Sequence, residues 1–479
     1  MSSKTKTLGI LALGRSTFDV DYAEQRLVVM LDLLEKSGHS VCGSPELLFD
    51  GDAATAAIDE LVVQQPDKIL ILQVTFTDAG SIAELAAKTD IPLMIWSVPE
   101  PRAGGRLRLN SFCGLNLASH SLGLQQRQFG WIYTAPESPQ ASIKLKQLLD
   151  GECDTAALSP VPPAVAYPGI SSSTEQEQNK ASRALAALQG KKIARIGEHP
   201  PGFSTCQYDA TALNRATGIT VEEHPIGMLF EKATQVDEPQ TAGVRTSVEQ
   251  QISGLEEVDQ EQLTKSLKLT GALQTLSRNQ AYDAFALRCW PETFTEYGGA
   301  ACGAAAMLGE NRVPCACEAD VYGSVTQLLL QEISDQPVFL VDLVDVDVED
   351  NTAVVWHCGQ APISMCAESA QARATIHTNR KMPLLYEFPL RPGKVTLLRW
   401  SQASGKQQLM IASAAMLERD MSFTGTSGVL EFTEPAERVL QRVISSGLEH
   451  HVALVYGDCL LYTSPSPRDA TLSRMPSSA

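Results

Sequence analysis

Residues 68–98, KILILQVTFTDAGSIAELAAKTDIPLMIWSV, contain two short apolar runs on either side of a segment with helical periodicity. Apolar runs of about four to eight residues that alternate with helices are typical of a parallel sheet covered on both faces. The pattern extends outward, with TLGILALG and a predicted helix from Tyr22 to Ser37 before it and WIYTAP after it. We therefore predict a doubly wound α/β domain over residues 1–150.

The first predicted strand is not followed by a nucleotide-binding fingerprint. The motif G-x-G-x-x-G is absent there, and the pair Gly104-Gly105 lies in an arginine-rich loop after a later strand. Because that motif lets the backbone approach a pyrophosphate at a helix start, its absence argues against a Rossmann dehydrogenase.

The rest of the chain is predicted to form two further domains. Residues 151–190 are rich in Pro, Ser, Glu and Gln, which indicates a linker that leads into a helix. KKIARIG then begins a second α/β domain over residues 191–331. Short strand-like runs such as TAVVWHC (352–358) predict an antiparallel, barrel-like β domain over residues 332–458. The predicted fold class is thus two doubly wound α/β domains followed by a C-terminal antiparallel β domain.

The last residues, 459–479, break this pattern. The sequence CLLYTSPSPRDATLSRMPSSA has no usable amphipathic period and concentrates Ser, Pro and Arg. It resembles translated adapter sequence at the end of an assembled gene, so we interpret it as foreign to the protein. A natural disordered tail is the alternative interpretation.

The composition excludes several classes of function. The 479 residues include 38 Lys and Arg against 56 Asp and Glu, and this net charge of −18 would repel a phosphate backbone, so no nucleic-acid partner is expected. The apolar run at the N-terminus is too short for a signal sequence or a membrane span, which predicts a cytoplasmic protein without a membrane partner. The 11 cysteines are scattered and are predicted to be reduced, buried thiols.

Two carboxylates lie at the predicted junction between an apolar strand and the following helix. The sequence CACEADVYGSVTQLLL places Glu318 and Asp320 at this junction. Ligand sites collect at such junctions because the loop is exposed while the scaffold stays rigid. For Asp320 we favour a structural role as the cap of the following helix. For Glu318 we favour a functional role, since an unpaired buried carboxylate is costly.

Further metal-binding side chains end other strands of the C-terminal part. Asp342 closes the apolar run PVFLVD, His357 closes TAVVWH, and His450 and His451 precede VALVYGD. Carboxylates and imidazoles from different elements can enclose one cation, and such mixed sites suit Mn²⁺, Mg²⁺ or Co²⁺ better than structural zinc. A histidine at a strand end can also be purely structural, and the sequence does not establish that these groups converge.

Six motifs in this order resemble the second half of sugar isomerases of the L-fucose and L-arabinose type: CWPE, EYGGAAC, CEADVYGS, FLVD, WHCG and GLEHH. The fucose-isomerase-like branch is the closer of the two, and the likeness is best between Ala286 and Gly359. In that family Mn²⁺ lies between a Glu after a strand, an acidic residue further along and a C-terminal His. Glu318, Asp342 and His451 match these positions.

The resemblance also implies additional site residues. The arabinose branch adds a histidine ligand, which His357 matches. That branch ends its site with a His-His pair whose second member is the ligand, so the resemblance favours His451 over His450. Trp290, Trp356 and His450 are predicted to contact the substrate.

In the first domain the resemblance is looser. Arg15 follows the opening strand like a substrate-contacting arginine of the fucose enzymes, and Trp96 lies where a neighbouring subunit donates a tryptophan to the sugar pocket. Asn110, Asn116 and His120 lie in a segment that resembles the family's helix beside that loop. A pairing with carboxylates is the alternative for Arg15, the core for Trp96 and helix packing for His120. Since family members form trimers paired as hexamers, the resemblance implies a homo-oligomer.

Together these features predict a metal-dependent aldose–ketose isomerase that acts on a small sugar. The resemblance implies that Mn²⁺, or another divalent cation such as Mg²⁺ or Co²⁺, holds O1 and O2 while Glu318 and Asp342 move a proton through a cis-enediol. The sugar would be fucose-like, arabinose-like, sulfonated or otherwise modified. The alternatives are a non-catalytic sugar-binding or regulatory protein, and a metal-dependent sugar aldolase or epimerase.

Overall fold

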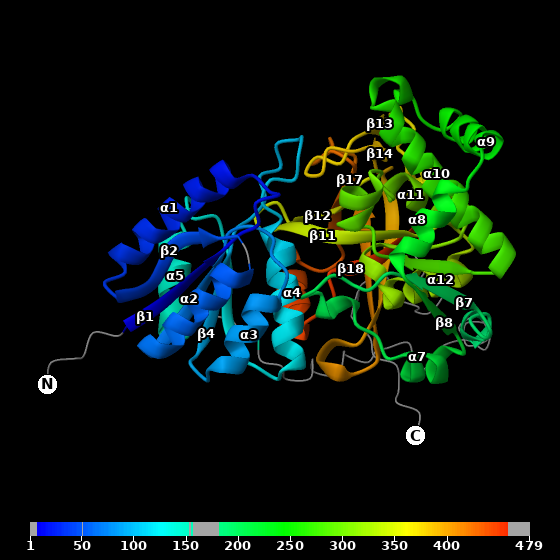
Figure 1. Cartoon of the computed structure of the whole chain (residues 1–479). Helices are drawn as coiled ribbons and strands as arrows, with labels where there is room; N and C mark the ends of the chain where they lie inside the picture. The colour runs from blue at the N-terminus through cyan, green and yellow to red at the C-terminus, as the bar shows by residue number, and fades with distance from the viewer. Residues whose placement is uncertain (1–6, 50, 153–154, 157–181, 458–479) are drawn as a thin grey trace, which may run out of the picture.

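The computed structural model describes residues 7–49, 51–152, 155–156 and 182–457. Within them the chain forms two parallel α/β sheets and one large β sheet that closes on itself (Figure 1). This confirms the predicted fold class. The residue boundaries of the domains stay predictions, and both the proline-rich part of the predicted linker and the interpreted foreign tail lie outside the described residues.

The N-terminal sheet has the strand order β2-β1-β3-β4-β5-β6, parallel except for β6. The central strands β3 and β4 are buried almost throughout, as expected for strands with helices on both faces. The strands are β1 Thr7–Leu13, β2 Ser40–Leu48, β3 Lys68–Gln73, β4 Leu93–Ser97, β5 Phe129–Tyr133 and β6 Thr155–Ala156. The helices are α1 Val20–Lys36, α2 Gly51–Gln64, α3 Gly80–Lys88, α4 Ser111–Leu124 and α5 Ala141–Asp150.

The second sheet is smaller and parallel, with the order β10-β9-β7-β8. Its strands are β7 Lys192–Ile196, β8 Thr220–His224, β9 Ala284–Leu287 and β10 Cys315–Ala316. The helices around it are α7 Ala210–Thr217, α8 Ile226–Thr234, α9 Glu238–Glu249, α10 Gln260–Gln280, α11 Cys302–Glu310 and α12 Val321–Ser334. The segment between β7 and α7 contains one short 3₁₀ turn, η2 Ser204–Cys206.

The C-terminal sheet is a barrel, because β12 pairs with both β11 and β17. The closed order is β12-β11-β18-β15-β16-β17, and β14 and β13 extend it beyond β17. One pairing, β14 with β17, is parallel, whereas the sequence predicted only antiparallel strands. The strands are β11 Phe339–Asp347, β12 Thr352–His357, β13 Arg373–Thr375, β14 Leu385–Pro389, β15 Gly393–Ser401, β16 Gln408–Met416, β17 Thr426–Phe432 and β18 His451–Tyr456, with the helix α13 Ala436–Ser446 before β18.

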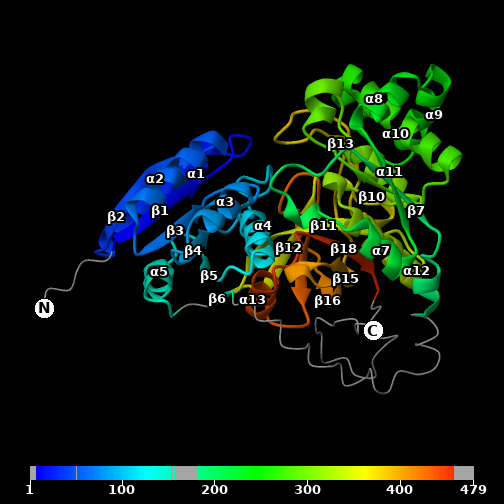
Figure 2. The same ribbon diagram turned by 60° about the horizontal axis from the view of Figure 1, so that its bottom comes forward.

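Helix α4 lies between the N-terminal sheet and the barrel (Figures 1 and 2). Nearly all its residues are buried, which fits the sequence SFCGLNLASHSLGL, in which no charged face exists. Asn116 donates through Nδ2 to the carbonyl of Leu448, and His120 donates through Nδ1 to the carbonyl of Gly447 at 2.8 Å. The N-terminal domain thereby fixes the turn that leads into β18.

A buried polar contact joins the N-terminal domain to strand β11. Asp345 accepts hydrogen bonds from Arg102 Nε at 2.6 Å, from the Tyr133 hydroxyl at 2.5 Å and from the backbone N–H of Glu100 at 3.2 Å. The carboxylate is almost completely buried, so its charge depends on these donors.

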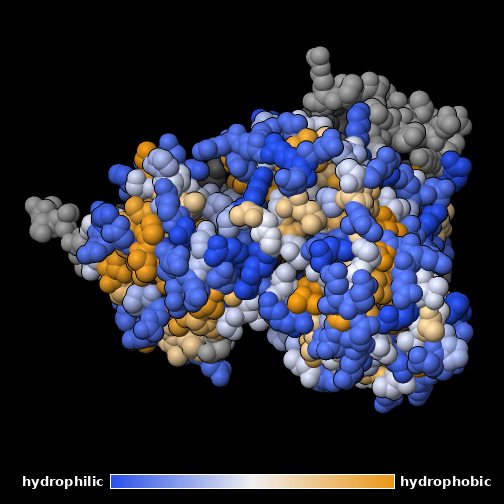
Figure 3. All heavy atoms as spheres, turned by 90° about the horizontal axis from the view of Figure 1, so that it is seen from above, coloured by the Kyte–Doolittle hydropathy of each residue, from blue (hydrophilic) through white to orange (hydrophobic). Residues whose placement is uncertain are grey.

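Hydrophobic atoms gather on the outer part of the N-terminal domain, at the left of Figure 3. Large exposed apolar side chains of α1, β2 and α2 include Val28, Val41 and Val63. Among the described residues no helix is long and apolar enough to cross a membrane. The homo-oligomer implied by the resemblance stays a prediction.

Replacing Asp345 with Asn should lower the free energy of unfolding by about 3–5 kcal/mol, because the mostly buried Arg102 then keeps only Asp350, 4.0 Å away, as a counter-ion. Urea unfolding followed by circular dichroism measures this change. Asp90→Asn is the matched control, since Asp90 pairs with Arg127 but is fully exposed, and its effect should be far smaller. Equal effects of the two substitutions would contradict the role given to Asp345.

Candidate metal and sugar site

Glu318 projects from a tight turn directly after β10. The turn η5 (Cys317–Ala319) places Glu318 at φ 59° and Ala319 at φ 56°, two successive non-glycine residues in the left-handed region. Such residues cost on the order of 1–3 kcal/mol each and persist where the surroundings fix them. Here Trp290 Nε1 donates to Glu318 Oε1 at 2.9 Å, and His450 Nε2 donates to Oε2 at 2.8 Å.

Asp320 connects three elements through one buried carboxylate. It caps α12 by accepting the backbone N–H of Gly323 at 2.8 Å, which confirms the predicted helix cap. It also accepts from Arg399 of β15 at 2.6 and 3.1 Å and from His451 Nδ1 at 3.0 Å. Neither of the last two contacts was predicted from the sequence.

The contact with Asp320 determines which nitrogen of His451 is free. Since Nδ1 carries the proton donated to Asp320, Nε2 keeps its lone pair. Nε2 lies 3.8 Å from Glu318 Oε2 and 3.6 Å from Asp342 Oδ1. A carboxylate that orients an imidazole in this way is typical of a metal-binding histidine.

Strand pairing places Asp342 beside these groups. In the register of β11 and β18, Asp342 stands opposite His451, and across β12 it stands opposite Trp356. Donor atoms of Asp342, His357 and His451 lie within 4.8 Å of one another, as do those of Cys206, Glu318, His450 and His451. His451 belongs to both groups, so the four ligands that the resemblance implied, Glu318, Asp342, His357 and His451, surround one region.

The donor set fits a divalent cation. Asp342 Oδ1 is buried and has no hydrogen-bond partner in the described part of the chain. A buried oxygen of this kind needs a partner, and a cation between two carboxylates and an imidazole would supply it. Burial raises the pKa of the Cys206 thiol well above its usual value, so this thiol stays protonated and is a poor ligand.

The pKa shifts distinguish the adjacent histidines. Burial opposes ionisation of Glu318, but the hydrogen bond from His450 and the nearby imidazoles prevail and lower its pKa to about 2. Burial likewise opposes the charge of His450, yet its bond to Glu318 raises the pKa of His450. Burial and the neighbouring His450 lower the pKa of His451. His451 is thus the neutral imidazole of the pair, which favours His451 as the ligand.

His357 is less suited to bind a cation. Although burial disfavours its charge, Cys358, Asp342 and Glu318 raise the pKa of His357 to about 9. In the neutral ring, Nδ1 accepts the backbone N–H of Cys358 at 2.9 Å, so Nε2 carries a proton in both the neutral and the charged form. The geometry therefore favours His357 as a hydrogen-bond donor inside the site.

These groups open into a pocket between the N-terminal domain, the second sheet and the barrel. Residues of all three parts line it, and they combine aromatic, polar and charged side chains. Among the predicted substrate contacts, four line this pocket: Arg15, Trp290, Trp356 and His450. Asn110 lines it too, whereas Asn116 and His120 hold the turn before β18.

The prediction for Trp96 is wrong. Trp96 is 0% exposed in the core of the N-terminal domain, and its indole N–H donates to the carbonyl of Thr134 at 3.0 Å. A side chain held in this way cannot reach a neighbouring subunit. The resemblance suggested a pocket residue, but Trp96 lies in β4, a central strand whose side chains are covered on both faces.

The prediction of reduced cysteines is also wrong for one pair. The structure joins Cys289 and Cys317 in a disulfide, with Cα atoms 5.8 Å apart, and both residues line the pocket. Their separation of 28 positions in the sequence gave no sign of this pairing.

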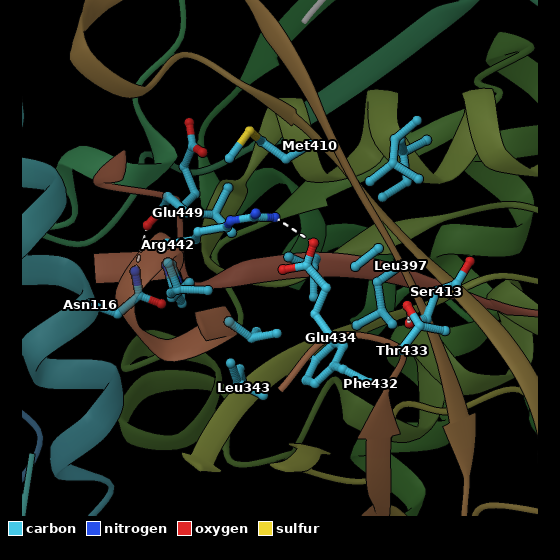
Figure 4. A pocket seen from close by; sticks show the side chains of 18 residues that line it. Asn116, Leu343, Leu397, Met410, Ser413, Phe432, Thr433, Glu434, Arg442 and Glu449 are labelled. Carbon is cyan, nitrogen blue, oxygen red and sulfur yellow. Dashed lines mark hydrogen bonds and ion pairs between the residues drawn. The ribbon is translucent and has the colours of Figure 1, made fainter. Parts of the chain in front are cut away.

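A second cavity lies inside the barrel next to α13 (Figure 4). Its walls are mainly aliphatic, and its charged residues Glu434 and Arg442 already pair with each other at 2.8 Å. His450 lines both this cavity and the pocket with the carboxylates. A polyhydroxylated sugar requires many polar partners, so this cavity is not the sugar site.

Comparison with known proteins identifies the family. Residues 9–150 match the N-terminal domain of fucose/sulfoquinovose isomerases. Sulfoquinovose isomerases from Priestia megaterium (strain ATCC 12872 / QMB1551), Alkalicoccus urumqiensis and Clostridium sp. (strain MSTE9) are each 29% identical to this chain, across 94% of its length and 94% or 95% of theirs. The chain is therefore similar to the fucose/sulfoquinovose isomerase family over nearly its whole length. This confirms the predicted family and the predicted class of enzyme, an aldose–ketose isomerase.

Solved sugar-binding proteins align only weakly with this chain. A carbohydrate transporter from Acidothermus cellulolyticus 11B in complex with myo-inositol covers 69% of the chain and 88% of its own, at 9% identity and a TM-score of 0.20. That score carries no argument about fold or function.

Replacing Asp320 with Asn should weaken Mn²⁺ binding by about 10- to 100-fold, because His451 loses the carboxylate that sets its tautomer and orientation. Titration of the folded variant with Mn²⁺ measures the affinity. Asp209→Asn is the matched control, since Asp209 caps α7 through Thr211 and Ala212 in the same way but does not touch the site. Unchanged affinity in Asp320→Asn, or an equal loss in Asp209→Asn, would contradict the orienting role.

Proposed function

We propose that this chain is a divalent-metal-dependent aldose–ketose isomerase that acts on a sulfonated sugar. The observation that carries the proposal is the arrangement around His451 Nε2, which Glu318 approaches from the turn η5 at 3.8 Å and Asp342 from strand β11 at 3.6 Å. The named activity of the relatives, sulfoquinovose isomerisation, supports the reaction class and a modified sugar as substrate.

In this proposal Glu318, Asp342 and His451 hold the cation. A bound divalent cation would act as a Lewis acid that acidifies the C–H next to the substrate carbonyl. The requirement for Mn²⁺, Mg²⁺ or Co²⁺ is supported by the mixture of carboxylate oxygens and a neutral imidazole.

The two carboxylates form the acid/base pair. One removes the proton from the carbon next to the carbonyl, and the same or the opposed carboxylate returns it to the adjacent carbon. Oxygens of Glu318 and Asp342 lie 3.8 and 3.6 Å from His451 Nε2, so both carboxylates can reach the same edge of a bound substrate. His450 keeps Glu318 ionised, and His357 can donate a hydrogen bond to an oxygen of the enediol.

The pocket walls favour a sugar in this position. Trp290 and Trp356 are held by hydrogen bonds from their indole N–H groups to Glu318 and to the carbonyl of Thr424 at 2.8 Å. Fixed aromatic faces pack against sugar C–H groups and exclude water from the reacting carbons. The non-catalytic sugar-binding alternative needs no convergence of Glu318, Asp342 and His451.

Isomerisation in D₂O tests the cis-enediol directly. A proton that passes through Glu318 or Asp342 exchanges with solvent, so the product should carry deuterium at the carbon that receives the proton. Proton NMR of the product measures its incorporation. A hydride shift between the two carbons would give a product free of deuterium and would contradict the proposed acid/base roles.

Glu318→Gln and Asp342→Asn should each lower kcat/KM by about 10²- to 10⁴-fold and reduce bound metal, because each removes a ligand charge and a base while keeping volume. The double variant should lose far less than the product of the two losses, since both groups act in one site. Asp347→Asn, on the same strand β11, is the control and should keep activity. Additive losses would argue for separate roles.

A further inference from the structure

One side of the pocket carries two guanidinium groups that the isomerase chemistry does not use. The guanidinium carbon of Arg15 lies 5.3 Å from the Trp290 ring, and that of Arg380 lies 4.7 Å from the same ring. Trp290 meanwhile directs its N–H at Glu318. One indole therefore separates the carboxylate end of the pocket from a positively charged end.

The two arginines differ in how their charge is balanced. Arg15 donates to Asp78 at 2.8 Å and is thereby largely neutralised. Arg380 has no ion pair and no side-chain hydrogen bond to any residue that the structure describes, although it lines the pocket and is partly buried. Its guanidinium lies over the faces of Trp290 and Phe294, the latter at 5.3 Å. A half-buried cation without a counter-ion is costly, which points to a negatively charged ligand.

The loop that carries Arg380 is built to hold it in place. His377 Nδ1 accepts the backbone N–H groups of Asn379 and Arg380, both at 3.3 Å, and the backbone of His377 bonds to Met382 and Lys381. Asn379 accepts from Arg106 Nη2 at 2.9 Å, which ties the loop to the N-terminal domain. Because these contacts already fix the backbone of the loop, less conformational entropy is lost when a ligand binds to Arg380.

We propose that Arg380 is the specificity-determining residue for a sulfonate at the end of the sugar remote from Glu318 and Asp342. The inference rests on the proposed function and assigns the charged end of its substrate. A sulfonate carries one negative charge, which matches one unpaired guanidinium. A phosphate carries close to two negative charges at neutral pH. The second charge would have no partner, because Asp78 already neutralises the nearby Arg15.

The test compares Arg380→Gln with the unchanged protein on matched aldoses that carry a sulfonate, a phosphate or a hydroxyl at the same carbon. A charge-assisted hydrogen bond contributes about 1.5–3 kcal/mol. The ratio of kcat/KM for the sulfonated over the hydroxyl sugar should therefore fall roughly 10- to 150-fold. Arg380→Lys should restore part of the ratio, and Arg419→Gln, which removes an exposed arginine paired with Asp350, should leave it unchanged.

Calorimetric binding of the sulfonated sugar to the metal-loaded protein separates this inference from the proposed function. If no sugar is isomerised but Arg380→Gln still weakens sulfonate binding by the same factor, the proposed function fails and the role of Arg380 stands. Equal losses for charged and neutral sugars would show a purely structural role and overturn the inference. A preference for the phosphorylated sugar that depends on Arg380 would overturn the assignment to a sulfonate.

Discussion

The buried carboxylate of Asp320 is the contact on which the site depends. It caps the N-terminus of α12, neutralises Arg399 of the barrel and fixes the imidazole of His451 on β18. All three partners are buried, so a misplaced Asp320 would leave an unpaired charge in the interior. The second sheet and the barrel are therefore held in one relative position, and in that position His451 Nε2 faces Glu318 and Asp342.

Local patterns in the sequence were sufficient for much of the fold. The alternation of apolar runs and helices predicted both parallel sheets, and short β-rich runs predicted the barrel, because burial on each face follows the period of the strand. The parallel pairing of β14 with β17 and the closure through β12 and β17 depend on chain segments far apart, which local patterns do not specify. Trp96 was misassigned because the resemblance is loose in the first domain, whereas the burial of this side chain is set by neighbouring elements of the fold.

The site was predictable where strand ends carried acidic residues or histidines. Glu318, Asp342, His357 and His451 stood out in the sequence because a charged or ionisable group at the end of a buried run is unusual, and the structure brings all four together. Arg380 gave no such signal, since it lies in a polar loop without periodicity and meets Trp290 only in the folded protein. The Cys289–Cys317 disulfide likewise joins two segments whose proximity is tertiary.

Anomalous diffraction from crystals of the protein grown with Mn²⁺ tests most directly whether Glu318, Asp342 and His451 form one cation site. The account predicts one strong peak inside the pocket, roughly 2.0–2.2 Å from a carboxylate oxygen of Glu318 and of Asp342 and from Nε2 of His451. A peak coordinated elsewhere, or a fully loaded, active crystal in which any of these three side chains lies beyond coordination distance, would contradict it.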